Sequence, residues 1–405
     1  MKKTLLTLIS ALLIAAFALT ACAPAATPTP TAAPAVPTTP PVTTVTIWHG
    51  YHTGGSEEAA LTNLVNQYQK DHPNVKVTVL AIPFDQIFNK YETETAAGGG
   101  PDMFTAPNDS LGNEVRANVV APIDDLVKGK LDGYTKAGIG GVTVEGKMYA
   151  VPGIAKAVAL YYNKSTIPTP PATTADLLAL VKSGKKLVLN ESAYHNFGFT
   201  GAFGGKLMDD TGKCVADQGG FADAFQYLVD LKAAGAKFET DGGKADTEFR
   251  QGQADMIING PWVLGDYKKD LGDKLAVAPI PAGPKGPANP IAGIDGWYIN
   301  PNSKNQAAAV DVALYIFGKD GLAAYADTVT GPGDPPARSD VTIKDPLVKS
   351  FADAAAGGFP RPQSAEFGNF WGPFGDALTA AVEGTAKPAD AVATACQKMN
   401  QANKK

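Results

Sequence analysis

The chain has 405 residues, of which 44% are hydrophobic, and its formal net charge at pH 7 is −5. This acidic balance argues against a surface that binds nucleic acid, because such surfaces are basic. The length allows two folded domains rather than one.

Residues 1–21 predict a bacterial export signal. Lys2 and Lys3 form a positive segment, and residues 5–19 are apolar but too few to span a bilayer as a mature helix. Residues 19–22, Leu-Thr-Ala-Cys, resemble a bacterial lipobox, in which the signal is cleaved before a cysteine whose thiol then carries lipid. An ordinary signal peptide followed by an incidental cysteine is the alternative. The lipobox predicts an exported, extracytoplasmic chain that is anchored to the cell membrane at Cys22.

Residues 22–44 predict a spacer between this anchor and a folded body. From residue 24 to residue 44 the sequence is a Pro/Thr/Ala tract without an aromatic side chain. Such a tract has nothing to bury and favours an extended, polyproline-rich chain. We expect it to hold the body away from the membrane surface. No later apolar stretch of the sequence is long enough to cross a membrane.

Two cysteines remain after Cys22, namely Cys214 and Cys396. An exported protein enters an oxidising compartment, where a disulfide between the two is expected to be stable. Two buried free thiols are the alternative, and the sequence leaves both open.

The body begins with the pattern of a doubly wound α/β domain. Residues 45–48 and 75–79 have the character of strands, and residues 56–68 between them place their leucines and valine on one helical face. The turn-rich loop after the first strand contains Tyr51 and His52.

The pattern continues with a helix over residues 84–97 and a buried strand at 103–105. Asp109 lies in the loop beyond the carboxyl end of that strand. Ligands of open α/β sheets bind at this edge. Asp109 is therefore either a helix cap or a ligand-binding carboxylate.

A second α/β unit follows a strand at 158–163, with a crossing between lobes expected near 153–157. Further strands are predicted at 187–189, 254–259, 275–280 and 291–299, the last as a second crossing. Helices are predicted at 175–182, 221–234, 307–317, 321–328, 346–355, 370–383 and 389–400.

Trp262 follows the buried strand at 254–259 through a Gly-Pro turn. Glycine and proline end the strand, so the tryptophan ring lies beyond its carboxyl end. A ring in that place is either a platform for ligand recognition or a core residue that seals the sheet.

Five segments of the body form an ordered set along the chain. They are residues 47–48 with the glycine-rich loop after them, 100–104 (Gly-Pro-Asp-Met-Phe), 146–152 (Gly-Lys-Met-Tyr-Ala-Val-Pro), 160–164 (Leu-Tyr-Tyr-Asn-Lys) and 249–262, which ends in Gly-Pro-Trp. Together, in this order, they resemble the extracellular solute-binding proteins of bacterial ABC importers, specifically the maltose-binding-protein-like group that binds sugars. Each segment alone is weak evidence, but the ordered set covers nearly the whole body.

This resemblance implies a type II periplasmic-binding-protein fold, in which hinge strands join two α/β lobes and a ligand cleft lies between them. The expected N-terminal lobe comprises residues 45–154 plus 298–341, and the expected C-terminal lobe comprises 155–297 plus 342–405. The resemblance also implies a monomeric binding protein rather than an enzyme, with no cofactor. Its expected partners are a carbohydrate and the transmembrane subunits of an ABC permease, which recognise the closed form.

The resemblance also implies ligand-binding residues. In sugar-binding relatives, aromatic rings stack on the C–H faces of sugar rings, and carboxylates accept hydrogen bonds from hydroxyls. By position, Trp262 and Trp371 match stacking tryptophans, and Asp109 matches a sugar-binding aspartate. Tyr194 matches a cleft tyrosine, and Trp297 lies where several relatives use an aromatic residue.

The chain departs from the best-known maltose binder at several of these places. Ala106 and Ser110 stand where that protein has a tryptophan and an arginine beside its aspartate. In the first loop a lysine is replaced by a segment that carries Tyr51 and His52, and Lys156 stands in place of a glutamate. Lys156 could bind a hydroxyl or an acidic sugar, or be a solvated lysine at a hinge. The expected ligand is a maltose- or maltodextrin-like di- or oligosaccharide, with an acidic sugar, a polyol or a monosaccharide as alternatives.

Two other functions have weaker support in the sequence. A metal-binding lipoprotein would use His49 and His52, but the only other histidines are His72 and His195, so a four-ligand zinc set is missing. A secreted glycosidase would need a second carboxylate beside Asp109, and the sequence places none there. We therefore expect neither a metal site nor a catalytic residue.

Overall fold

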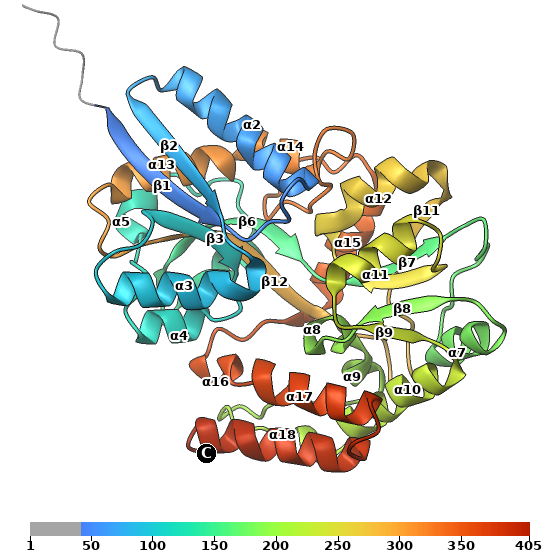
Figure 1. The fold of residues 1–405 in the computed structure, drawn as a ribbon. Helices are drawn as coiled ribbons and strands as arrows, with labels where there is room; N and C mark the ends of the chain where they lie inside the picture. The colour runs from blue at the N-terminus through green and yellow to red at the C-terminus, as the bar shows by residue number, and fades with distance from the viewer. Residues whose placement is uncertain (1–41) are drawn as a thin grey trace, which may run out of the picture. The chain divides into compact units, whose positions relative to one another are not determined.

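The computed structural model describes residues 42–405. The predicted signal segment, Cys22 and the spacer up to residue 41 lie outside these residues. Within residues 42–405, no helix combines the length and the apolar character that a bilayer span requires. The body is of the α/β class and contains two sheets with helices packed around them (Figure 1).

The first sheet has six strands in the order β13-β12-β3-β1-β2, with β6 also paired to β12. Its strands are β1 (Thr43–His49), β2 (Val75–Ala81), β3 (Met103–Pro107), β6 (Ala150–Lys156), β12 (Ile291–Ile299) and β13 (Phe359–Pro360). β1 is parallel to β2 and β3, whereas β12 runs antiparallel to β3 and β6. The helices of this part are α2 (Ser56–Asp71), α3 (Phe84–Ala96), α4 (Leu111–Arg116), α5 (Asp124–Val127), α6 (Lys136–Gly141), α13 (Gln306–Ile316) and α14 (Lys319–Ala326). A small separate hairpin joins β4 (Thr143–Val144) to β5 (Lys147–Met148).

The second sheet has five strands in the order β11-β7-β10-β8-β9. They are β7 (Ala159–Asn163), β8 (Leu187–Asn190), β9 (Lys237–Glu239), β10 (Met256–Asn259) and β11 (Leu275–Ala278). β8 is parallel to β9 and β10, while β7 is antiparallel to β10 and β11. The helices of this part are α7 (Thr174–Lys182), α8 (Ala193–Asn196), α9 (Gly198–Ala202), α10 (Phe221–Ala234), α11 (Gly242–Arg250), α12 (Leu264–Leu271), α15 (Pro346–Gly357), α16 (Ala365–Gly368), α17 (Trp371–Val382) and α18 (Pro388–Ala402), with short 3₁₀ turns at Ala216–Gln218, Pro261–Val263 and Gly272–Lys274.

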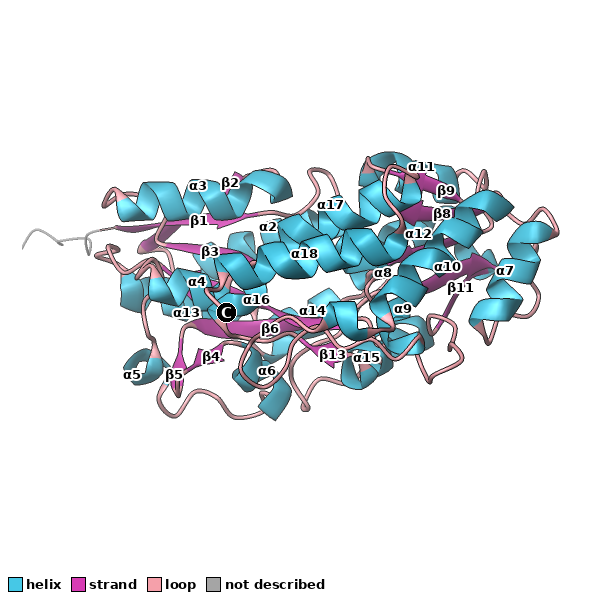
Figure 2. Cartoon of the chain, turned by 90° about the horizontal axis from the view of Figure 1, so that it is seen from below, coloured by secondary structure: helices cyan, strands magenta, loops and turns pink. Residues whose placement is uncertain are grey.

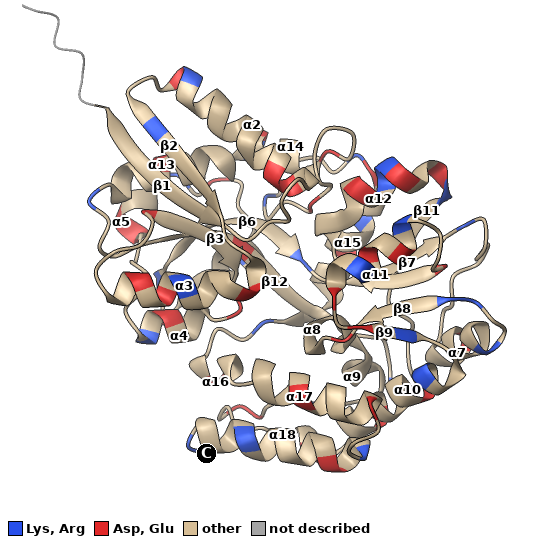
Figure 3. Ribbon diagram, in the orientation of Figure 1, with Lys and Arg blue, Asp and Glu red and all other residues tan. Residues whose placement is uncertain are grey.

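The central strands explain why this sequence folds into layered sheets. β8 and β10 are buried along their whole length, as expected for short apolar strands that are covered by helices on both faces. α10 places its buried side chains three or four residues apart, which gives it one apolar face. In Figure 3, the ribbon is coloured for charged residues mainly on helices and loops, and the strands carry few.

Hydrophobic side chains form two large cores. One core draws on residues between Val45 and Ile154 and between Ile294 and Val341, and the other draws on residues between Val158 and Ile291 and between Phe367 and Met399. We call the parts around these cores the N-terminal lobe and the C-terminal lobe. A third, smaller cluster packs α11, α12 and α15 against the second sheet.

Three chain segments meet where the lobes join. The chain leaves the first sheet at the end of β6 and enters the second sheet at Ala159, next to the predicted crossing at 153–157. β12 pairs alongside β6. The segment between α14 and α15 also runs beside β6, since the Ala155 amide donates to the Pro335 carbonyl at 2.9 Å and the Ala337 amide donates to the Gly153 carbonyl at 2.7 Å.

The C-terminal helices complete the second lobe. α17 and α18 lie side by side, as Figure 2 shows from below. Cys214 and Cys396 form a disulfide, with their Cα atoms 5.4 Å apart, that ties α18 to the loop before α10. This bridge fixes α18, and the α17 packed on it, to the rest of the C-terminal lobe.

Candidate functional site

The ring of Trp262 lies just beyond the end of β10. Gly260 leaves room for it, because a Cβ at Gly260 would come within 1.9 Å of the Trp262 ring. The Gly260 carbonyl is held by the Tyr161 hydroxyl, which donates to it at 2.7 Å. The turn is therefore fixed, and it places a partly buried ring at the edge of the C-terminal lobe.

Two further aromatic rings lie next to Trp262. Tyr194 in α8 has its ring centroid 6.2 Å from that of Trp262 and 6.4 Å from that of Trp371 at the start of α17. We call Tyr194, Trp262 and Trp371 the aromatic row. All three rings are partly exposed, so the row offers apolar faces on which a flat or cyclic ligand can stack.

Asp109 from the N-terminal lobe lies at one end of this row. The Trp371 indole Nε1 donates to the Asp109 backbone carbonyl at 3.4 Å. The Asp109 carboxylate forms an ion pair with the guanidinium of Arg361. Burial raises the pKa of Asp109, and the charge of Arg361 partly offsets that effect. The predicted aspartate is therefore positioned by both lobes.

Arg361 is a site residue that the sequence reasoning missed. Its side chain is only 2% exposed, and its Cζ lies 5.5 Å from the Tyr194 ring centroid and 5.6 Å from that of Trp371. Gly293 on β12 leaves room for the Arg361 guanidinium, since a Cβ at residue 293 would lie 2.6 Å from it. The sequence held no local signal for the pair, because Arg361 and Asp109 are 252 positions apart.

Lys156 lies at the opposite end of the row, at the last residue of β6. Its ammonium is 2.7 Å from a carboxylate oxygen of Glu57 and 2.8 Å from one of Asp295. It also lies 5.7 Å from the ring centroid of Tyr51 and 5.5 Å from that of Trp262. Burial opposes its charged form, but the nearby carboxylates outweigh burial and raise its pKa well above the ordinary value. Lys156 is therefore a buried, paired cation rather than a solvated lysine.

A third carboxyl group, Asp334, completes this arrangement. We call Lys156, Glu57, Asp295 and Asp334 the charge cluster. The three carboxyl residues are 5%, 1% and 0% exposed in that order, and neither carboxylate oxygen of Asp334 has a hydrogen-bond partner among the described residues. Burial is the main cause that raises the pKa of Asp334 well above its ordinary value, and the charge of Glu57 adds to it.

Six of the eight predicted ligand-binding residues lie in this continuous arrangement. They are Tyr51, Lys156, Trp262, Tyr194, Trp371 and Asp109, in their order along the site.

His52 and Trp297 are not part of this arrangement. The His52 side chain is exposed, and Trp297 is 0% exposed in the N-terminal core, with its ring 5.9 Å from that of Phe317. Trp297 does not reach the aromatic row because Phe317, the residue after α13, packs on its ring and covers it within the N-terminal core. Asp295, two residues earlier on β12, contacts Lys156 of the charge cluster.

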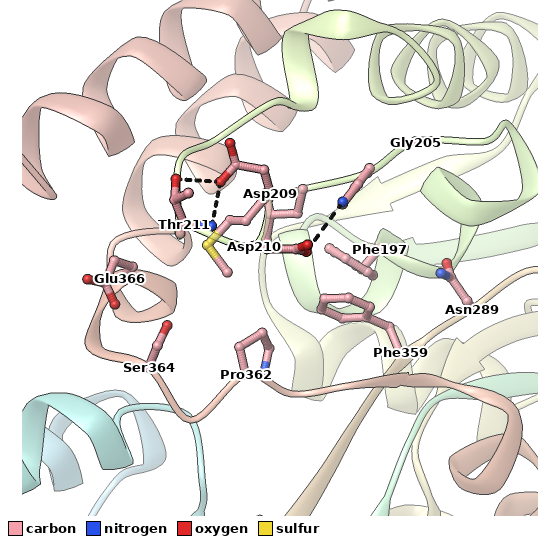
Figure 4. A pocket seen from close by; sticks show the side chains of 14 residues that line it. Phe197, Gly205, Asp209, Asp210, Thr211, Asn289, Phe359, Pro362, Ser364 and Glu366 are labelled. Atoms are coloured by element: carbon pink, nitrogen blue, oxygen red, sulfur yellow. Dashed lines mark hydrogen bonds and ion pairs between the residues drawn. The ribbon is translucent and has the colours of Figure 1, made fainter. Parts of the chain in front are cut away.

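A cavity of about 520 Å³ lies elsewhere in the C-terminal lobe (Figure 4). The rings of Phe197 and Phe359 line it together with Pro362, and it contains none of the eight predicted residues. The Asp209 carboxylate on its rim already accepts hydrogen bonds from Thr211 and Lys213. We take the aromatic row and the charge cluster as the candidate site, because stacked rings of the C-terminal lobe meet charged groups of the N-terminal lobe there.

The metal-binding alternative finds no geometric support in residues 42–405, where no group of three or more His, Cys, Asp or Glu side chains is arranged to hold an ion. Burial lowers the pKa of His49, whose ring lies 3.8 Å from Glu58, while His52 remains exposed.

Comparisons with known proteins bear on the family and the fold of this chain. A family model described as bacterial extracellular solute-binding protein matches residues 63–356. The chain is 27% identical to a maltotriose-binding protein of Pyrococcus abyssi over 350 aligned residues. The alignment covers 81% of this chain and 75% of that protein. It is 26% identical over 373 residues to a maltooligosaccharide ABC transporter solute-binding lipoprotein of Streptococcus pneumoniae, with 84% of each chain covered. The solved structure of the Thermus thermophilus maltotriose binding protein bound with maltotriose superposes with a TM-score of 0.81 at 30% identity, covering 88% of this chain and 99% of that one.

Proposed function

Because the chain belongs to the bacterial extracellular solute-binding protein family, we propose that it captures a maltose- or maltodextrin-like di- or oligosaccharide and delivers it to an ABC permease. It has the type II periplasmic-binding-protein fold and acts outside the cytoplasm. Its relatives are binding proteins rather than enzymes. The proposal rests on one observation above the others: the aromatic row of the C-terminal lobe meets Asp109 of the N-terminal lobe.

The chemistry of the site supports a sugar ligand. Aromatic faces bury the C–H surfaces of sugar rings, which supplies most of the affinity. Asp109 and Asp295 offer carboxylate oxygens that accept hydrogen bonds from hydroxyls, and an unmatched hydroxyl pattern leaves such buried groups unpaired at a cost. We therefore expect the rings to supply affinity and the carboxylates to supply selectivity.

The charges favour a neutral sugar over an acidic one. Lys156 and Arg361, the cations beside the aromatic row, are each already paired with carboxylates of the chain. An acidic sugar would bring another negative charge to a region where carboxylates outnumber these cations, and burying an unpaired charge is unfavourable. A neutral monosaccharide or a polyol remains the alternative that these charges do not oppose.

The proposed mechanism is closure of the two lobes around the ligand. We propose lobes of residues 45–154 plus 298–341 and of 155–297 plus 342–405, and the two separate cores support this division. A ligand that contacts both lobes stabilises the closed arrangement, which the permease subunits then recognise. We further propose that Cys22 carries the lipid anchor and that the mature protein works as a monomer.

A thermal-shift panel tests the proposed function. The ligands are maltose, maltotriose, trehalose, cellobiose, xylobiose and galacturonate. We expect maltose or maltotriose to raise the melting temperature most, because a ligand that binds only the folded state adds about 4 kcal/mol of stability at 1,000 times its Kd. Galacturonate is expected to have no effect. Absence of a shift with every sugar, or chromatographic detection of cleaved maltotriose, would contradict the proposal.

A further inference from the structure

The charge cluster holds more negative than positive charge in a buried place. Glu57, Asp295 and Asp334 surround one ammonium, that of Lys156, and all four residues are less than 10% exposed. Lys156 is within ion-pair distance of Glu57 and Asp295, and within residues 42–405 the Asp334 carboxylate has no hydrogen-bond donor. Burying three ionised carboxylates with a single cation is costly, and the usual relief is that one carboxyl takes up a proton.

Asp334 is the group best placed to carry that proton. The groups whose charges influence Asp334 are Glu57 on α2, Lys156 at the end of β6 and Asp295 on β12, and its own charge influences the buried phenols of Tyr51, Tyr161 and Tyr325. A protonated Asp334 can donate to Glu57, so the pair becomes a hydrogen-bonded acid and carboxylate. The pKa values of both carboxyl groups are raised, mainly by burial, which agrees with one shared proton.

The burial of this cluster depends on contacts across the junction of the lobes. Trp262 of the C-terminal lobe lies against Lys156. The Gly265 amide of α12 donates to the Pro332 carbonyl at 2.8 Å, two residues before Asp334. Moving the C-terminal lobe away from these contacts admits water to the cluster, and a hydrated carboxyl has an ordinary pKa near 4.

We propose that closure of the lobes over a sugar takes up one proton, which Asp334 and Glu57 share, so that Asp334 sets the affinity of the site without touching the sugar. This inference rests on the proposed function. Asp334 is thus a positioning residue that acts through Glu57 and Lys156.

The direction of the pH dependence follows from linkage. A proton that binds the closed form more tightly favours closure, so affinity is highest at low pH. The affinity falls as the pH rises from the ordinary carboxyl pKa of the open form towards the raised pKa of the closed form. For one proton, the fall is at most about ten-fold per pH unit. A site without proton uptake would keep a constant Kd over the same range.

Calorimetric titration of the exported chain with maltotriose measures this uptake directly. Titrations at pH 7.0, 7.75 and 8.5, each in phosphate and in Tris, report proton uptake from the difference in heat between the buffers. This range lies above the pKa of His195, which burial lowers to about 4, and above that of His49, which burial also lowers. We expect uptake of a substantial fraction of one proton and a Kd that rises across the range.

Two variants identify the group. Asp334→Asn is expected to remove both the buffer dependence and the pH dependence, and Glu57→Gln does the same if Asp334→Asn fails to fold. Asp353→Asn removes an exposed carboxylate of α15 that pairs only with Lys349, and it is expected to behave as the parent chain. Maltotriose binding without proton uptake overturns this inference and leaves the proposed function intact. Undiminished uptake in Asp334→Asn also overturns it, because the proton then binds elsewhere, such as at Asp109.

Discussion

Replacement of Lys156 by methionine is expected to lower the free energy of unfolding by about 3–5 kcal/mol. The substitution keeps the length and the apolar stem of the side chain but removes the cation that pairs with both Glu57 and Asp295. Buried carboxylates that lose their partner must either stay charged at a high cost or take up protons at neutral pH. Urea denaturation of the parent and the variant at pH 7.5 gives the difference in the free energy of unfolding.

An exposed ion pair provides the matched control for this experiment. Lys349→Met breaks the pair with Asp353 in α15, whose partners are 66% and 65% exposed. Exposed pairs contribute about 0–1 kcal/mol, so this variant should unfold almost as the parent chain does. A loss of less than about 1 kcal/mol in Lys156→Met would mean that Lys156 is hydrated rather than paired in solution.

Replacement of Trp262 by alanine is expected to weaken maltotriose binding by at least about 2 kcal/mol, which is about a 30-fold rise in Kd. The ring is the member of the aromatic row nearest the charge cluster, and its centroid lies 5.5 Å from the ammonium of Lys156. Its removal takes away stacking area and leaves the charge cluster open to water. Calorimetric titration of the parent and the variant gives the change.

Trp297→Phe is the control for the loss of an aromatic residue as such. Trp297 is fully buried in the N-terminal core and does not reach the aromatic row. This variant should unfold more easily but bind maltotriose with a Kd within about two-fold of the parent value, since it removes no ligand contact. An unchanged Kd in Trp262→Ala, or a large change in Trp297→Phe, would reverse the assignment of the two tryptophans.

Local pattern was enough to predict the parts of the site that lie next to single strands. The Gly-Pro turn after β10 places Trp262, and the loop after β3 places Asp109, because strand ends in α/β sheets are readable from short apolar runs. The same reasoning anticipated a crossing near the end of β6, where Lys156 lies. The places of these residues at strand ends depend on the sequence within a few positions of the chain.

Features that depend on distant pairing were not readable in the sequence. Arg361 reaches Asp109 across 252 positions, and the charge cluster draws its members from four separate segments. Trp297 is packed in the core against Phe317, although its position in the family pattern suggested the cleft. The role of Lys156 stayed open because the sequence does not display burial or pairing. These two properties decide whether a lysine is solvated or held in an ion pair.

A crystal structure of the protein grown with maltotriose tests the central claim most directly. The account predicts sugar rings stacked on Trp262 and Trp371, with a hydroxyl hydrogen-bonded to Asp109 and the two lobes closed around the ligand. Maltotriose bound instead in the cavity lined by Phe197 and Phe359, with the aromatic row empty, would contradict it.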